Sequence, residues 1–201
     1  MTAWVRTFAV GTWLLVACAA VSAQPQMPEG WDRYLGHPRG PYRGRVIDAD
    51  TKSPIAGAVV AAYWVRERIY PLRSSRERYA VREVTTNDVG QFVLDASDIE
   101  GNAPKRILHP EFRIFVPGYG AFPEFSRSPR GFIGGIFWGQ GATVELNRPD
   151  ARDIRLRSMR SVDPYNWSEQ PFLELPHLVE AFNRERVFLG LEPIVDLEKR
   201  K

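Results

Sequence analysis

The stretch GRVIDADTKSPIAGAVVAAYWV, Gly44 to Val65, decides the fold class of this chain. Two runs rich in β-branched and aromatic residues flank a polar segment that contains Pro54. Asp, Thr and Ser side chains in that segment can accept nearby backbone N–H groups, and proline fixes φ, so the segment favours a turn. Gly57 allows a backbone conformation that other residues resist. The stretch therefore predicts a strand, a tight turn and a second strand that pair as a hairpin.

Short strands with turn signals between them continue along the chain. The further predicted strands are residues 80–86, 91–94, 112–116, 143–146 and 154–156. Asn87-Asp88-Val89-Gly90 predicts a tight turn, and Pro117-Gly118 ends another strand. Regular short strands separated by turns are typical of an all-β sandwich. After Ser161 the pattern changes, and Pro176 could begin a helix that runs to about Leu189. We therefore expect a short C-terminal helical extension over residues 161–201.

The N-terminal segment has the three-part layout of a secretory signal peptide over residues 1–23. An apolar run from Phe8 to Val21 is shorter than the roughly 20 residues that a spanning helix needs. A small-residue pattern ends at Ala23, and a linker rich in proline and glycine follows over residues 24–41. Both features predict an exported protein of the periplasm or cell envelope.

Residues 15–18 offer a second way to process the N-terminus. The sequence Leu15-Val16-Ala17-Cys18 resembles the bacterial lipobox, in which the cysteine is acylated. Lipidation at Cys18 and cleavage after Ala23 both stay open. Cys18 is the only cysteine, so the folded part has no disulfide and must be stabilised by packing. The net charge of +3 in 201 residues does not by itself imply a nucleic-acid partner, and none is expected.

Three motifs in order resemble the carboxypeptidase regulatory-like domain, a prealbumin-like (transthyretin-like) Greek-key β-sandwich. The first is Gly44 to Val60, the second is Thr86 to Phe92 with Asn87 where aspartate is usual, and the third is Phe115 to Tyr119. The resemblance implies a domain over residues 42–160, with closing strands at 143–146 and 153–157. It also implies a set of turn-defining residues: Asp48, Pro54, Gly57, Asn87, Gly90, Pro117 and Gly118. Its glycines are expected at bends where a side chain would collide.

The sequence lacks the motifs of the common enzyme classes. It has no P-loop, HExxH, GxSxG or CxxC motif. His37, His109 and His177 have no metal-ligand spacing, and Asp48 with its acidic neighbours favours turn capping over calcium binding. The zinc peptidase domain that accompanies the regulatory-like domain in carboxypeptidases is not found here. We therefore expect no cofactor, no metal and no catalytic residue, and the chain is predicted not to be an enzyme.

Two segments depart from the family pattern and could carry binding. Residues 66–82 form a charged loop or irregular hairpin, which could bind an anionic surface or satisfy its arginines by internal ion pairs. Residues 121–141 insert a glycine-rich aromatic stretch before the closing strands, and its apolar part, residues 132–138, could be a packed loop or an exposed aromatic patch. The candidate binding residues in and near these segments are Trp64, Tyr70, Tyr79, Phe132, Phe137 and Trp138.

These observations predict a non-catalytic exported module for protein interaction or scaffolding in the cell envelope. The alternative is a carbohydrate- or peptidoglycan-binding module that uses its aromatic rings as stacking faces. A remote alternative is a small transthyretin-like hydrolase with His109 beside Arg106. The expected partner is an envelope protein or a cell-wall glycan, and contact with a membrane is expected only through a lipid anchor at Cys18.

Overall fold

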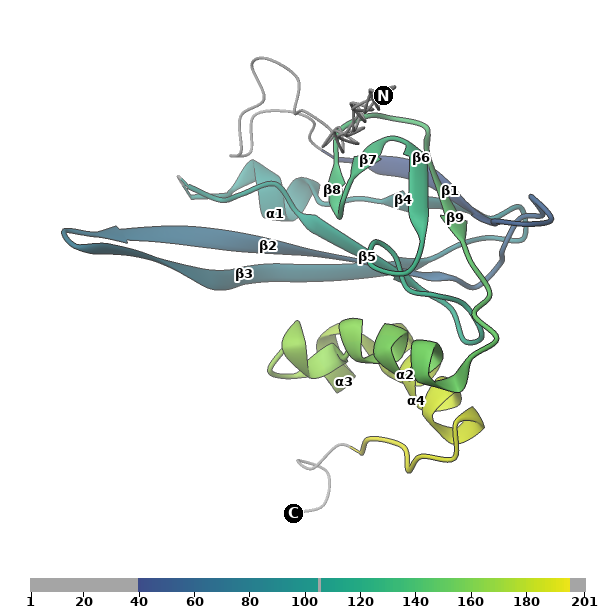
Figure 1. The fold of residues 1–201 in the computed structure, drawn as a ribbon. Coiled ribbons are helices and arrows are strands. Elements are labelled where there is room, and N and C mark those ends of the chain that lie inside the picture. Colours follow the sequence, from purple (N-terminus) through teal and green to yellow (C-terminus); the bar gives the residue numbers. More distant parts are fainter. Residues whose placement is uncertain (1–39, 105, 196–201) are drawn as a thin grey trace, which may run out of the picture.

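The computed structural model of the protein describes residues 40–104 and 106–195. Within these residues the chain is mostly β, with two sheets and a few short helices (Figure 1). The predicted signal peptide, the lipidation site Cys18 and the linker as far as Arg39 lie outside the described residues. Within the described residues, no helix combines the length and the apolar character that crossing a bilayer requires.

The first sheet has four strands in the order β4-β1-β9-β6. Its members are β1 (Tyr42–Asp48), β4 (Gln91–Leu94), β6 (Arg127–Arg130) and β9 (Ala142–Leu146). Strand β1 runs antiparallel to β4 and parallel to β9. Because side chains alternate along a strand, β1 buries Tyr42 and Val46 and leaves Arg43 and Arg45 exposed on the outer face.

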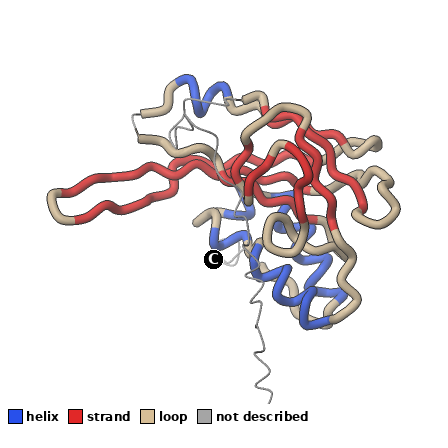
Figure 2. Tube along the Cα trace, turned by 45° about the horizontal axis from the view of Figure 1, so that its top comes forward, coloured by secondary structure: helices blue, strands red, loops and turns tan. Residues whose placement is uncertain are grey.

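The second sheet has five strands in the order β3-β2-β5-β8-β7. Its members are β2 (Val59–Tyr70), β3 (Arg73–Thr85), β5 (Glu111–Phe115), β7 (Phe132–Ile133) and β8 (Ile136–Phe137). Strands β2 and β3 pair antiparallel along their whole length, with a register shift between Trp64 and Val65. Past β5 this hairpin projects from the body as a long arm (Figures 1 and 2). The segment 66–82, predicted as a loop or irregular hairpin, is therefore mostly regular strand.

Gly44 to Val65 does not form the predicted hairpin. Strands β1 and β2 belong to different sheets, and the residues between them cross from one sheet to the other. The predicted turn is present, since Asp48 Oδ1 accepts the N–H groups of Asp50 and Thr51 at 2.9 Å each. The pairing was wrong because a local pattern specifies strands but not their partners, which are chosen by long-range burial.

The two sheets share one hydrophobic core. Its members come mainly from the inner faces of β1, β4 and β9 on one side and of β2, β5, β7 and β8 on the other. Four rings in the core meet edge to face, with centroids 5.0 to 5.3 Å apart; these are Tyr42, Phe112, Phe132 and Phe137. Such pairs stabilise a core beyond their buried area.

A helical layer covers the outer face of the five-stranded sheet (Figure 1). It consists of α2 (Arg152–Ser161), the 3-10 helix η1 (Pro164–Asn166), α3 (Pro171–Glu174) and α4 (Pro176–Phe188), while α1 (Ser97–Gly101) lies apart from it. Val59 and Ala61 of β2 pack with Trp167 and Leu178 of this layer, so β2 is buried on both faces. Glu83 of β3 accepts the N–H group of Leu178 at 2.9 Å and so caps the start of α4.

The predicted closing strand at 153–157 is wrong, because these residues lie in helix α2. The last strand ends at Leu146 and the helical segment begins at Arg152, earlier than the predicted boundary at 161. An ion pair between Asp153 and Arg157, one helical turn apart at 3.2 Å, supports the helix locally. Met159 packs against α4, so burial of the helix face favours helix over strand.

The expectation that side chains would collide at the turn glycines is correct at only one of them. A Cβ on Gly90 would lie 2.5 Å from the carbonyl oxygen of Val46. Gly57 and Gly118 have open space around them, and their φ values of +69° and +89° are what favour glycine. At Asn87, the side-chain Oδ1 accepts the Gln91 N–H at 2.8 Å and holds the intervening turn.

Candidate functional site

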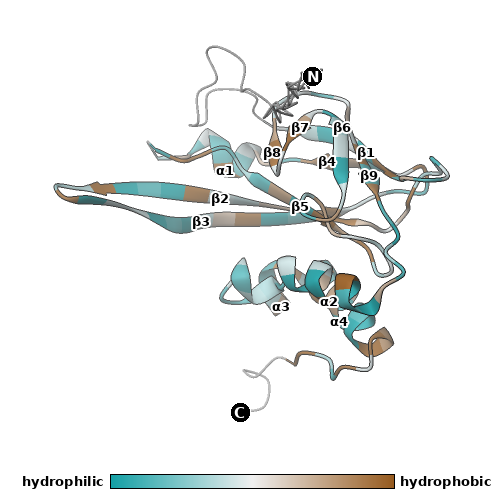
Figure 3. Cartoon of the chain, viewed as in Figure 1, coloured by the Kyte–Doolittle hydropathy of each residue, from teal (hydrophilic) through white to brown (hydrophobic). Residues whose placement is uncertain are grey.

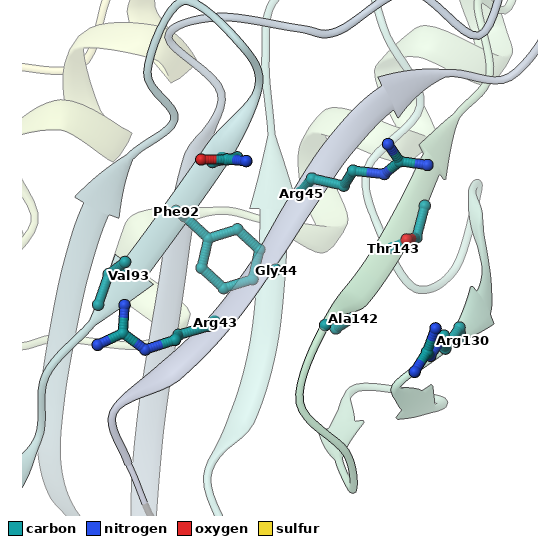
Figure 4. Close-up of a pocket in the computed structure, with 10 residues that line it drawn as sticks. Arg43, Gly44, Arg45, Phe92, Val93, Arg130, Ala142 and Thr143 are labelled. Atoms are coloured by element: carbon teal, nitrogen blue, oxygen red, sulfur yellow. The ribbon is translucent and has the colours of Figure 1, made fainter.

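A groove of about 390 Å³ lies on the outer face of the four-stranded sheet (Figure 4). All four strands of that sheet contribute side chains to it: Arg43, Arg45, Gln91, Val93, Arg130 and Thr143. None of the residues that line the groove is acidic.

Strand register places four of these polar side chains in one row across the sheet. Arg45 pairs with Gln91 of β4 on one side and with Thr143 of β9 on the other, and Thr143 pairs with Arg130 of β6. Residues directly opposite each other share a face of a sheet, and neighbouring strands lie about 4.8 Å apart. The row from Gln91 to Arg130 therefore spans about 14 Å of surface.

The middle of the groove is apolar and lies close to the backbone. A Cβ on Gly44 would lie 2.7 Å from the ring of Phe92 and 2.9 Å from the carbonyl oxygen of Ala142. Gly44 is thus required by the close approach of Phe92 on the core side of the sheet, and in the groove the β1 backbone itself lies between Arg43 and Arg45 (Figure 4).

The groove is positively charged. Among the described residues, Arg43, Arg45 and Arg130 form no ion pair with a carboxylate. The acidic side chain farther along β9 is Glu145, which is held by Lys52 at 2.9 Å and by Arg127 at 2.8 Å. Lys52 first and Arg127 second hold the pKa of Glu145 below its ordinary value, so its negative charge is already compensated.

Three guanidinium groups that line one groove and form no ion pair among the described residues can bind an anion. Arginine presents planar donors that match a carboxylate or phosphate with two hydrogen bonds, and it stays charged at all physiological pH values. Gln91 and Thr143 add donors and acceptors that suit hydroxyl groups. Because the row of polar side chains crosses all four strands, the groove suits an extended ligand that lies across the strands.

A second and larger cavity, about 540 Å³, lies where the Pro117-Gly118 turn meets α2 and α4. Most of its charged side chains are paired with one another or with neighbours, namely Arg155 with Glu185, Arg148 with Asp48, and Arg184 with Glu180; Asp150 is the lining residue without an ion pair among the described residues. Compensated charges leave little attraction for a charged ligand. We therefore assign this cavity to the stability of the fold and place the candidate site in the groove.

Asp48 is the centre of a hydrogen-bond network beside that cavity. Besides the two turn N–H groups, its Oδ2 accepts the Tyr119 hydroxyl at 3.0 Å and Arg148 Nε at 2.9 Å. The N–H donor of Thr51 is the main cause that holds the pKa of the Asp48 carboxyl well below its ordinary value, and the other donors add to it. The turn that the sequence indicated is thus also an electrostatic anchor between β1 and the segment after β9.

The Asp48→Asn variant is expected to lose about 2 kcal/mol of unfolding free energy at pH 7, because an amide cannot accept from Arg148 on its nitrogen side. A carboxyl whose pKa is lowered on folding stabilises the fold above its unfolded pKa and loses that contribution as pH falls. The wild-type protein should therefore lose stability below about pH 4, and the variant should show a shallower loss there.

Urea unfolding followed by circular dichroism between pH 7 and pH 2.5 measures both effects. Asp50→Asn is the matched control, because Asp50 lies in the same turn and its carboxylate is exposed. Equal pH profiles for the two variants would contradict the role given to Asp48.

The structure does not bring the predicted binding residues together. Trp64, Phe132 and Phe137 are buried in the core, so they cannot contribute to a binding surface. Tyr79 is half-buried against the same core, Tyr70 lies at the far end of the arm, and Trp138 is exposed after β8. Large aromatic side chains gain most by burial, which explains why most of this set is internal.

His109 and Arg106, the pair proposed for a hydrolase, also differ in exposure. His109 is buried, whereas the Arg106 side chain is exposed. Among residues 40–104 and 106–195, no three His, Cys, Asp or Glu side chains converge as ligands of a metal ion.

Comparison with known proteins gives little. No family model matches the chain, and no curated protein matches it. Among solved structures, the chain is similar to 3-chlorocatechol 1,2-dioxygenase from Rhodococcus opacus 1CP, with 12% identity over 64% of this chain and 68% of that chain and a TM-score of 0.28.

This neighbour is an enzyme, which contradicts the prediction that the present chain is not one. The prediction rested on missing motifs, and motifs of local sequence do not detect sites assembled from distant strands. A TM-score of 0.28 transfers neither the fold nor the chemistry of the dioxygenase to this chain.

Sequence reasoning missed the groove residues. Arg43 and Arg45 are separated by one residue on a predicted strand, which places them on the same face, and that signal was available. Arg130 could not be found in this way, because it lies in an insertion that gave no clean strand pattern. Its place beside Thr143 depends on a pairing between β6 and β9 that is formed only in the folded chain.

Proposed function

We propose that this chain is an exported binding module of the cell envelope whose groove on the four-stranded sheet holds an acidic cell-wall glycan. The observation that carries the proposal is the row Gln91, Arg45, Thr143 and Arg130 across four strands, in a groove without acidic side chains. Export is supported by the signal-peptide pattern of residues 1–23.

A glycan suits the row better than a small ion does. Carboxylates of the glycan would meet the arginines, and its hydroxyls would meet Gln91 and Thr143. A row of about 14 Å offers contacts to several groups of an extended ligand at once. Because each contact is solvent-exposed, affinity would come from their number.

The alternative of a protein-interaction module has less support. It was motivated by the apolar segment 132–138, and two of its large side chains, Phe132 and Phe137, are in the core. Trp138 stays available, with 42% of its surface exposed. The backbone N–H of Trp138 donates to the carbonyl of Gly131, which follows Arg130, so the Trp138 ring could extend the same glycan site.

The proposal includes the prealbumin-like Greek-key topology that the three motifs resemble. Its support is that β1 has β4 and β9 as neighbours, whereas β2 and β3 lie in the other sheet. Connections that skip between sheets in this way are a feature of Greek-key sandwiches. An experimental structure in which β1 pairs with β2 would contradict it.

The glycan proposal is tested by titrating the full chain with soluble peptidoglycan fragments that carry free carboxylates, using calorimetry. Arg45→Gln and Arg130→Gln are each expected to weaken binding about tenfold or more, because a hydrogen bond to a charged group contributes about 1.5–3 kcal/mol. Affinity should fall as salt is raised.

Arg160→Gln is the matched control, since Arg160 is an exposed arginine on α2, in the helical layer beside the other sheet, and does not line the groove. It should bind as the wild type does. Flat titrations with the wild-type chain, or equal losses in the control and the groove variants, would overturn the proposed function.

A further inference from the structure

The outer part of the β2–β3 hairpin stands clear of the rest of the described chain. Strand β5 pairs with β2 only as far as Tyr63. Beyond that point, residues 106–108 form backbone hydrogen bonds with β2 as far as Glu67. From Arg68 to Ser75, the two strands of the hairpin pair with each other and with no other strand of the described residues. At about 3.3 Å per residue this free part projects on the order of 10 Å (Figure 2).

The end of this arm is apolar and exposed. Leu72 in the turn is 99% exposed, Ile69 is 58% exposed and Tyr70 is 43% exposed. Figure 3 shows the hydrophobic colour at the end of the arm, beyond a hydrophilic shaft. Folding alone gives no reason to place three large apolar side chains on a point that packs against nothing.

Arginines surround the apolar end on both faces of the hairpin. Strand register places Arg68 and Arg73 on the face of Tyr70, and Arg76 on the face of Ile69. Arg68 is engaged by Glu77, together with Arg66. Arg73 stacks over the Tyr70 ring at 5.5 Å, and among the described residues neither Arg73 nor Arg76 forms an ion pair. Internal ion pairing therefore satisfies Arg66 and Arg68, whereas Arg73 and Arg76 keep no carboxylate partner among the described residues.

We propose that the end of the β2–β3 arm is a membrane-docking element that inserts Ile69, Tyr70 and Leu72 at the surface of an anionic lipid bilayer. Arg73 and Arg76, set behind the apolar end, bind the lipid phosphates. A reach on the order of 10 Å matches the depth of the boundary between headgroups and acyl chains. The contact differs from the lipid anchor expected at Cys18 and does not depend on the glycan groove.

The arrangement of charge favours a lipid surface over a protein groove. A groove in a partner would contact mainly one face of the hairpin, whereas here unpaired cations lie on both faces and the apolar side chains lie at the end. A planar surface with anionic groups outside and hydrocarbon inside complements that distribution. Tyrosine and arginine are also well suited to the membrane interface.

The first experiment uses the full chain and measures the local environment of the arm. A label on the arm reports on the surroundings of the arm, even if the N-terminal segment also binds the vesicle. A polarity-sensitive fluorophore is attached to Leu72→Cys in a Cys18→Ser background, with Leu173→Cys as the matched control. Leu173 is an exposed leucine on α3, away from the arm. Vesicles containing phosphatidylglycerol should shift the emission of the label at 72 to the blue and leave the label at 173 unchanged.

Vesicles of phosphatidylcholine alone should give a several-fold weaker shift, and Arg73→Gln with Arg76→Gln should weaken binding to anionic vesicles at least tenfold. Arg45→Gln in the groove should leave the shift unchanged, which separates this site from the glycan site. Inorganic phosphate at millimolar concentration should not reverse the shift, because a free ion offers no apolar phase.

No blue shift at position 72 with anionic vesicles, or the same shift at position 173, would overturn the proposal. So would full reversal by phosphate, which would reduce the arm to an anion site. A label at 72 that responds to a purified envelope protein and not to lipid would also overturn it.

Discussion

Glu185→Ala is expected to lower the free energy of unfolding by about 3–5 kcal/mol, because it leaves Arg155, whose side chain is only 14% exposed, without its partner. Glu185 of α4 is buried and accepts two hydrogen bonds from Arg155 of α2, each of 2.8 Å. Its Oε2 also accepts the N–H of Gly118 at 2.9 Å. One carboxylate thus joins both long helices to the turn after β5, and its loss should loosen the helical layer from the sheet.

Urea unfolding followed by far-UV circular dichroism measures this effect. Glu180→Ala is the matched control on the same helix, since Glu180 is exposed and meets Arg184 only at 3.6 Å; its expected cost is below about 0.5 kcal/mol. The double variant Arg155→Met with Glu185→Leu should be more stable than Glu185→Ala, because no buried charge is left alone. A loss below about 1 kcal/mol in Glu185→Ala would contradict the anchoring role.

Trp64→Ala is expected to cost about 3–5 kcal/mol, the range for removing a large aromatic side chain from a core. The indole is fully buried between the sheets, and its Nε1 donates to Glu100 at 3.1 Å. Glu100 is itself buried and also accepts the Tyr42 hydroxyl and the N–H of Gly40 at 2.9 Å. The variant would leave a cavity in the core and would remove one of the three hydrogen-bond donors to the Glu100 carboxylate.

Trp64→Phe separates the two contributions, because it keeps a ring and removes the N–H donor; we expect it to cost about 1–3 kcal/mol. Trp138→Ala is the surface control and should change stability by less than about 0.5 kcal/mol. If Trp64→Ala and Trp138→Ala were equally stable, the buried position of Trp64 would be wrong, and its earlier interpretation as an exposed stacking face would regain support.

The strands and turns of the first motif could be predicted because their causes are local. Asp48 accepts N–H groups two and three residues ahead, and Pro54 fixes φ in the same turn. The second run of β-branched and aromatic residues, now β2, was correctly predicted as a strand with at least one buried face in a sandwich. Its second buried face was not, because that face packs on helices that begin after Leu146.

The candidate site shows the same division. The spacing of Arg43 and Arg45 on one strand already places both on one face. The strand order β4-β1-β9-β6 places Gln91 and Thr143 on either side of Arg45, and it places Arg130 beyond Thr143. Conversely, the aromatic residues that looked suited to binding entered the core, since residue type alone does not distinguish a ring that stacks on a ligand from one that packs inside.

The sequence by itself determined that the chain is mostly β, where its main turns lie, and which residues alternate along β1. These properties depend on φ preferences, side-chain-to-backbone hydrogen bonds and a period of two, all of which act within a few residues. Only the tertiary structure decided that β1 and β2 lie in different sheets, that residues 152–161 are helical, and that three arginines line one groove. Those outcomes depend on which apolar faces bury one another across long sequence separations, and that choice is made by the folded chain as a whole.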